Sequence, residues 1–192
     1  MMTAKKLNFG NIMGHVTNVT NLASLASWTA DQFDPTLTWE DIAWIKDRWK
    51  GKLILKGIMD SEDAMLAVKA GADAIIISNH GGRQLDGAPS TISVLPEIVD
   101  AVNSKVEVHF DGGVRSGQDV LKALALGADC IHIGRPYVYG LGAKGQEGVE
   151  IAIEIIKKEL DLTMAMCGET NISNVGLHNF CLLYTSPSPR DQ

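Results

Sequence analysis

The fold is decided by an apolar run, Ala74-Ile75-Ile76-Ile77, that leads directly into Ser78-Asn79-His80-Gly81-Gly82-Arg83-Gln84-Leu85-Asp86. A short, mostly β-branched run without polar interruption is typical of a strand covered on both faces, as in a parallel sheet. The polar stretch begins where this strand ends. Parallel α/β folds place their functional loops at that end of the strands, so the sequence predicts a site here.

Similar apolar runs recur along the chain and alternate with helical patterns. We expect strands at 53–58, 74–78, 106–110 and 130–133, and helices at 39–49, 60–70, 92–103, 117–126 and 146–160. Such alternation fits a doubly wound sheet or a (β/α)8 barrel. The expected strands number half of those in a closed barrel.

The sequence also contains an internal repeat. Ser61-Glu62-Asp63 leading to Gly71-Ala72-Asp73 is echoed by Ser116-Gly117-Gln118-Asp119 leading to Gly127-Ala128-Asp129. The shift of about 55 residues matches two strand-helix units of roughly 30 residues each. The two parts of the chain are therefore expected to share one structural pattern.

The composition is that of an ordinary globular protein. The chain has 192 residues, 45% of them hydrophobic, and a net charge of −6, so we expect no nucleic-acid partner, which would need a basic face. Cys130, Cys167 and Cys181 are far apart and lack zinc-ligand spacing, so we expect reduced thiols and no metal site. No secretion signal is found, which favours a cytoplasmic location.

Three side chains, two within the stretch 78–86 and one in the first expected strand, can act in catalysis or ligand binding. His80 can accept a proton near neutral pH, and Arg83 can hold a carboxylate by two parallel hydrogen bonds. Lys56 is the one charge in an apolar strand and needs an anionic partner, unless it extends to the strand end. The alternative for His80 is a capping role in a polar loop. We interpret His109 and His132, which lie inside expected strands, as core-packing histidines.

Two glycine-arginine turns follow the last two strands. Asp111-Gly112-Gly113-Val114-Arg115-Ser116-Gly117 opens into a helix, and Gly134-Arg135-Pro136 follows the fourth strand. Exposed amides at a helix N-terminus, the helix dipole and arginine together favour a phosphate group, and Asp111 can accept hydrogen bonds from ribose-like hydroxyls. Without a G-x-G-x-x-G or Walker motif, a mononucleotide is favoured over a dinucleotide. Tight turns with solvated arginines are the alternative.

These motifs resemble those of the FMN-dependent α-hydroxy acid dehydrogenase and oxidase family, over about residues 8–175. The segment Phe33-Asp34-Pro35-Thr36-Leu37-Thr38-Trp39 is most similar to the bacterial L-lactate dehydrogenase branch. The resemblance implies an α/β fold, a TIM (β/α)8 barrel of which the chain holds about the last four β-α units. It also implies oxidation of an L-2-hydroxy acid, L-lactate foremost, to the 2-keto acid.

The resemblance assigns roles to particular residues. His80 would be the catalytic base and also contact the substrate, whose carboxylate Arg83 would bind. Lys56 would stabilise the reduced, anionic flavin. The cofactor-binding set implied for FMN is Lys56, Ser78, Asp111, Gly112, Gly113, Arg115, Gly134 and Arg135.

The resemblance also sets expectations for organisation and partners. We expect a mobile loop and lead-in at residues 1–38, the half-barrel at 39–175, and a disordered tail, foreign to the domain, at 176–192. The upstream units, with further flavin contacts, substrate tyrosines and the aspartate that pairs with the histidine, are not found. A half-barrel exposes apolar surface, so we expect it to aggregate or to pair with another half.

Partners follow from the same resemblance. The resemblance leaves the electron acceptor open among a quinone, a cytochrome and oxygen, and the full-length form is expected to be a homo-oligomer. Residues 8–30 contain no charged side chain and permit peripheral docking on the inner face of the cell membrane. A half-barrel that binds FMN or phosphate without turnover is the main alternative, and another FMN barrel, such as an isomerase, is the third.

Overall fold

The structure, a computed structural model, describes residues 12, 16, 19 and 22–180. The chain divides into two compact units, residues 1–41 and 42–192. In the first unit, α1 (Leu22–Asp31) is a ten-residue helix, and Val19 and Leu25 are buried. The segment 1–38, expected to be a mobile loop and lead-in, therefore contains one helix, and most of residues 1–21 lie outside the described residues.

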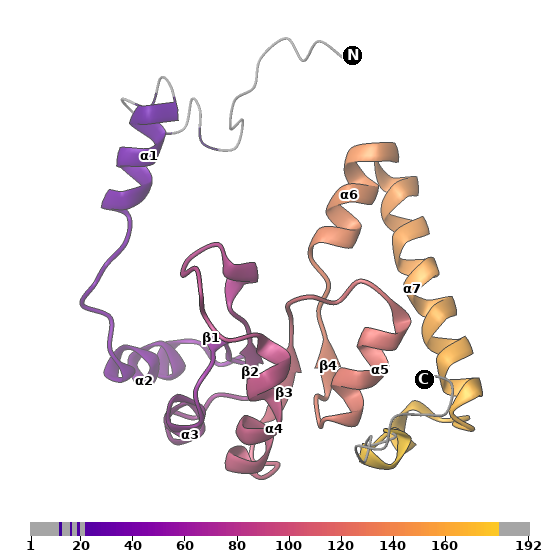
Figure 1. The fold of residues 1–192 in the computed structure, drawn as a ribbon. Coiled ribbons are helices and arrows are strands. Elements are labelled where there is room, and N and C mark those ends of the chain that lie inside the picture. The colour runs from indigo at the N-terminus through magenta and orange to yellow at the C-terminus, as the bar shows by residue number, and fades with distance from the viewer. Residues whose placement is uncertain (1–11, 13–15, 17–18, 20–21, 181–192) are drawn as a thin grey trace. The chain divides into compact units, whose positions relative to one another are not determined.

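The second unit is built around a parallel sheet in the order β1-β2-β3-β4. Its strands are β1 (Ile54–Ile58), β2 (Ala74–Ile77), β3 (Glu107–Phe110) and β4 (Cys130–Ile131). The helices in chain order are α2 (Trp39–Arg48), α3 (Ser61–Lys69), α4 (Thr91–Val102), α5 (Gly117–Ala125), α6 (Arg135–Lys144) and α7 (Gln146–Met166) (Figure 1). This is the alternation that the apolar runs predicted.

The expected boundaries hold closely, with three differences. The last strand stops at Ile131 rather than at residue 133, and α7 continues to Met166 rather than ending near residue 160. The expected ranges do not include α6, although Pro136 suits the first turn of a helix, and its Gly140 and Gly142 are poor helix formers. It packs antiparallel against α7, where Gly140 and Gly148 meet so closely that a Cβ on Gly140 would lie 2.2 Å from the Gly148 oxygen.

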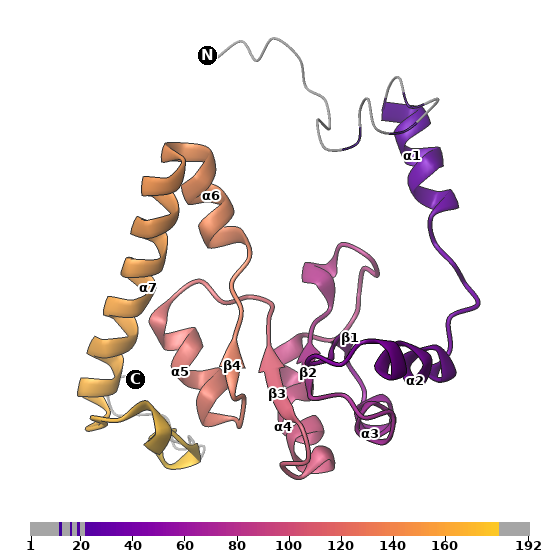
Figure 2. The same cartoon turned by 180° about the vertical axis from the view of Figure 1, so that it is seen from behind.

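Helices α3, α4 and α5 pack beside β1, β3 and β4 (Figure 2), and the two faces of the sheet differ in burial. The side chains that point toward the helices are almost wholly buried: Ile75, Ile77, Val108 and Phe110. On the other face, Ile54, Lys56 and Cys130 are exposed. In a closed barrel this second face lines the interior, so the sheet has the form of an open segment of barrel wall.

The internal repeat recurs in the hydrogen bonds between strands. Asp73 donates its amide to the Leu53 carbonyl over 2.8 Å and accepts the Leu53 amide on its carboxylate over 2.9 Å. Asp129 makes the same pair of bonds with Val108, both of 2.8 Å. Each aspartate therefore stands just before a strand and joins it to the neighbouring strand segment by two hydrogen bonds.

The end of the chain is more ordered than expected as far as it is described. Residues Leu177–Asn179 form a short 3-10 turn, η3, and Asn179 donates to the Glu169 carboxylate over 2.9 Å. Residues 177–180 therefore do not belong to a tail without structure, whereas 181–192 lie outside the described residues. In the part of the chain that is described, no helix combines the length and apolarity needed to cross a membrane.

Candidate active site

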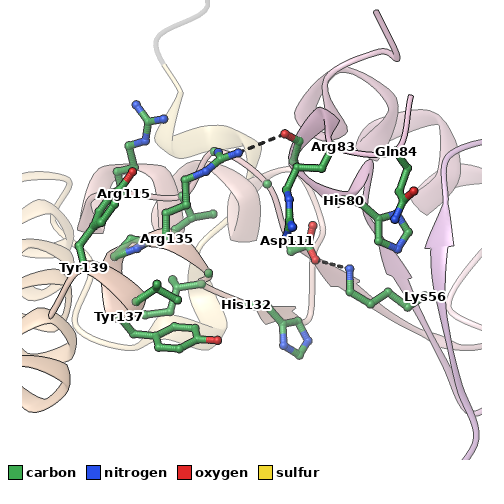
Figure 3. A pocket seen from close by; sticks show the side chains of 18 residues that line it. Lys56, His80, Arg83, Gln84, Asp111, Arg115, His132, Arg135, Tyr137 and Tyr139 are labelled. Carbon is green, nitrogen blue, oxygen red and sulfur yellow. Dashed lines mark hydrogen bonds and ion pairs between the residues drawn. The ribbon is translucent and has the colours of Figure 1, made fainter. Parts of the chain in front are cut away.

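A cavity of about 560 Å³ opens at the carboxyl ends of the strands (Figure 3). Its walls come from β1, from the turn after β2, and from the segments after β3 and β4. All the predicted site residues but one line it: Lys56, His80, Arg83, Asp111, Gly112, Gly113, Arg115, Gly134 and Arg135. The fold thus brings together motifs that lie far apart in the sequence.

Lys56 lies on the uncovered face of the sheet. Its anionic partner is Asp111, in the segment after β3. Its Nζ atom lies 2.6 Å from Asp111 Oδ2 and donates to Ser78 Oγ over 2.6 Å. Ser78 is the predicted residue that does not line the cavity. It is buried, and its hydroxyl also accepts the His80 backbone amide over 3.2 Å, so it links the Lys56 side chain to the backbone of the turn that carries His80.

His80 has an unusual backbone. Its φ of 55° lies in the left-handed region, which non-glycine residues seldom adopt and which is found repeatedly at functional sites. The Asn79 carboxamide accepts the Gly81 amide over 3.0 Å and so holds the turn, η1 (His80–Gly82), in shape. Among the described residues, no carboxylate lies within ion-pair distance of the His80 ring.

The first turn of α5 is closed to a ligand by the protein itself. The Asp119 carboxylate accepts the amides of Arg115 and Ser116, both over 3.0 Å, and Glu159 of α7 accepts the Gly117 amide over 3.0 Å. Burial acts to raise the pKa of Asp119, but these hydrogen bonds lower it below its usual value. The amides of Arg115, Ser116 and Gly117 therefore already have protein partners, and a phosphate at this end of α5 stays a prediction.

The N-terminus of α6 is the better position for an anion. Gly134 caps this helix without a side-chain hydrogen bond, and Pro136 stands in its first turn. The Arg135 guanidinium lies beside it and donates to the Gly81 carbonyl over 3.2 Å, while Arg115 reaches the same cavity from the opposite loop. Backbone amides, the helix dipole and arginine therefore converge here rather than on α5.

The cavity also contains residues that the sequence interpretation missed: Gln84, His132, Tyr137 and Tyr139. His132 is half-buried on the cavity wall and is not a core histidine, because β4 ends just before it. Burial, followed by the neighbouring His109, lowers the pKa of His132 below its usual value. The interpretation of His109 as a buried histidine agrees with the structure.

Comparison with known proteins gives consistent relatives. The family model for FMN-dependent dehydrogenases matches residues 2–181, more than the 8–175 expected. An L-lactate dehydrogenase of Vibrio cholerae serotype O1 is 44% identical over 174 residues, covering 91% of this chain and 46% of that protein. One from Stenotrophomonas maltophilia is 45% identical over 169 residues, covering 88% and 45%. The chain thus spans about half the length of the curated relatives it matches.

Solved structures agree with this assignment. A mandelate oxidase is 46% identical with a TM-score of 0.75, covering 80% of this chain and 44% of its own. A monotopic membrane protein, (S)-mandelate dehydrogenase, is 38% identical with a TM-score of 0.78, covering 85% and 43%. The sheet is four consecutive units of a (β/α)8 barrel, and the chain belongs to the FMN-dependent dehydrogenase family.

Proposed function

We propose that this chain supplies the FMN-binding and catalytic part of an L-2-hydroxy acid dehydrogenase whose substrate is L-lactate. The observation that supports this most is one cavity lined by Lys56, His80, Arg83 and Arg115. It combines a base, a carboxylate-binding cation and a phosphate-binding cation with a lysine. Simple phosphate binding would not need His80 and Arg83.

The residues present fit FMN. A volume of about 560 Å³ lies within the usual range of about 300–1,000 Å³ for small-molecule sites. The phosphate would lie at the α6 N-terminus between Arg115 and Arg135, with Gly112 and Gly113 giving close backbone approach. Lys56 would face the ring edge that becomes negative on reduction. The flavin supplies an acceptor for two electrons.

The remaining chemistry falls to the protein side chains. Arg83 fixes the substrate carboxylate by two hydrogen bonds and so orients carbon 2 and its hydroxyl. An unprotonated ring nitrogen of His80 accepts the hydroxyl proton. Overall, the substrate loses two protons, one from the hydroxyl and one from carbon 2, and two electrons, which the flavin would accept, and this gives the 2-keto acid.

Binding of FMN is the first test. Titration of the full chain with FMN, followed by flavin fluorescence, should show saturation. Arg115→Ala should weaken binding about tenfold or more, because a charged hydrogen bond is lost. Arg48→Ala is the matched control, since this guanidinium stacks on Trp44 at 4.0 Å and does not line the cavity. Equal losses in the two variants would contradict the assignment.

Turnover is the second test. Anaerobic L-lactate should bleach the bound flavin, and L-mandelate offered in parallel measures the preference between the two hydroxy acids. The second candidate is an FMN-binding half-barrel without turnover. It is favoured by the absence, among the described residues, of a carboxylate beside the His80 ring. Bound flavin that L-lactate leaves oxidised would select this candidate.

We extend the proposal to peripheral membrane contact through residues 8–30. This segment carries no charged side chain, and one relative is described as a monotopic membrane protein. Co-sedimentation with anionic lipid vesicles should fall when residues 8–30 are deleted. Equal co-sedimentation of the deleted and complete chains would remove this part of the proposal.

A further inference from the structure

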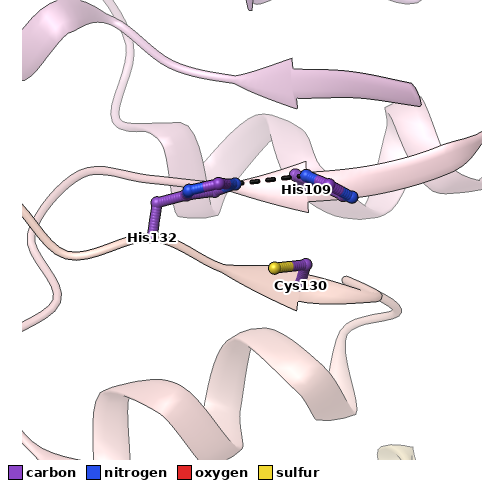
Figure 4. A group of neighbouring side chains, drawn as sticks. All are labelled: His109, Cys130 and His132. Carbon is purple, nitrogen blue, oxygen red and sulfur yellow. Dashed lines mark hydrogen bonds between the residues drawn. The ribbon is translucent and has the colours of Figure 1, made fainter. Parts of the chain in front are cut away.

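Three side chains that can bind metals meet on the uncovered face of the sheet (Figure 4). One ligand atom from each of His109, Cys130 and His132 lies within 4.8 Å of the other two. His109 Nδ1 and His132 Nε2 are 3.1 Å apart and share a hydrogen bond, whose proton a bound ion would displace into solvent. Thiolate and imidazole are the ligands that Zn²⁺ and related ions prefer.

The strand register creates this cluster. His109 pairs directly with Cys130 across β3 and β4, so their side chains point to the same face. His132 follows Cys130 by two positions and continues the pairing, because its amide donates to the Phe110 carbonyl over 2.8 Å. Side chains two residues apart along a strand share a face.

The distances suit a tetrahedral ion. With Zn–N bonds of about 2.0–2.1 Å, two imidazole nitrogens on one ion stand about 3.4 Å apart. The observed 3.1 Å between His109 and His132 differs from this by a few tenths of an ångström. A Zn–S bond of about 2.3 Å places sulfur about 3.6 Å from each nitrogen, and rotation about χ1 of the exposed Cys130 can bring the thiol closer.

A carboxylate already orients one of the ligands. Glu107 Oε2 lies 3.2 Å from His109 Nε2, which leaves Nδ1 directed toward His132. A metal-binding histidine usually donates a hydrogen bond from its other ring N–H to such an oxygen, and this bond fixes the tautomer of the ring.

We propose that His109, Cys130 and His132 form a binding site for a zinc-like divalent ion, with Glu107 as the orienting carboxylate. Three protein ligands leave a fourth position for water or a small anion. The site is independent of the proposed FMN function, although His132 also lines the cavity. The ion would link β3 to β4 and so stabilise the short last strand.

Cobalt provides the test, because Co²⁺ bound by a thiolate absorbs in the near ultraviolet and, when tetrahedral, strongly in the visible. Titration of the full chain with Co²⁺ should give both bands at one ion per chain, and Zn²⁺ should abolish them. Cys130→Ser should remove the near-ultraviolet band. Cys167→Ser, at an exposed cysteine that caps α7, is the matched control and should keep it.

Stability gives a second readout. Zn²⁺ should raise the melting temperature of the parent chain and of Cys167→Ser, but not of Cys130→Ser, since binding to the folded state alone stabilises it. His109→Gln and His132→Gln should each weaken Co²⁺ binding at least tenfold.

Two results would overturn the site. One is a thiolate band that survives in Cys130→Ser or disappears equally in Cys167→Ser. The other is a parent chain, folded by circular dichroism, that shows no saturable Co²⁺ spectrum. Since Cys130 is exposed, its conservative replacement keeps the test valid even if a histidine variant fails to fold.

Discussion

Gly57 and His80 are in contact: a Cβ built on Gly57 would stand 3.1 Å from Cε1 of the imidazole. Gly57 also has a φ of 99° and lies at an irregularity in the pairing of β1 with β2. The glycine therefore does two things, since it allows the irregular strand and leaves space for the ring.

Replacing Gly57 with alanine should destabilise the chain by more than backbone strain alone, which is about 1–2 kcal/mol. The added methyl group must also displace His80. Gly87→Ala is the matched control, because Gly87 has a φ of 78° and no heavy atom within 4 Å of a built Cβ. Urea unfolding of both variants measures the difference, and equal losses would show that His80 moves without cost.

The contact between α6 and α7 offers a paired test within one helix. Gly140→Ala should cost about 1–3 kcal/mol because its Cβ would overlap the Gly148 carbonyl. Gly142→Ala meets no atom within 4 Å and should be neutral or stabilise by about 0.5–1 kcal/mol. Chemical denaturation of the two variants reports the ranking, and the opposite order would contradict the close approach of the helices.

Stability should depend on pH through Asp73. Hydrogen bonds from Lys46, from the Leu53 amide and from Lys52 hold the pKa of this carboxyl well below its usual range. A carboxyl whose pKa is depressed by folding stabilises the folded state above its unfolded pKa, near 3.9, and loses that effect as the pH falls through the folded value. Asp73→Asn should therefore be less stable than the parent at pH 7, and the gap should close in acid.

Asp129→Asn is the control for this pH effect. Asp129 makes the same backbone bonds with Val108, but no lysine pairs with it among the described residues. We expect a smaller loss at pH 7 than for Asp73→Asn. Unfolding curves of both variants from pH 3 to 7 decide the matter, and a pH-independent gap for Asp73→Asn would argue against the lysine contribution.

Within the proposed function, Arg83→Lys should raise KM for L-lactate about tenfold or more, because one ammonium cannot reproduce a two-pronged bond to a carboxylate. Arg48→Lys, outside the cavity, should leave KM unchanged. Steady-state kinetics of the FMN-loaded protein measure both. An unaltered KM for Arg83→Lys would exclude this side chain from substrate binding.

The sequence predicted the features that depend on residues close together along the chain. Apolar runs located the strands β1 to β4, as the structure confirms. It did not predict contacts set by tertiary packing. Helix α6 contains two glycines and is stabilised by packing against α7. Glu159, which accepts the Gly117 amide at the start of α5, lies 42 positions further along the chain.

The same reason explains the overlooked site residues. His132 lies just beyond β4 because this strand is only two residues long. The apolar pattern of the sequence does not reveal where so short a strand ends. Its approach to His109 depends on the register between strands, and the ring nitrogens are separated by 23 positions in the sequence. Spacing rules for metal ligands describe short motifs and do not detect such pairs.

The closure of the α5 amides by Asp119 and Glu159 has one more consequence. With only the α6 N-terminus left to offer backbone amides, the full positive charges that meet a bound anion come from the long guanidinium side chains of Arg115 and Arg135. Dissolved ions screen such exposed charges over about 8–10 Å at moderate ionic strength. Occupancy of this cavity should therefore vary with the salt content of its surroundings far more than that of an amide-lined cradle would.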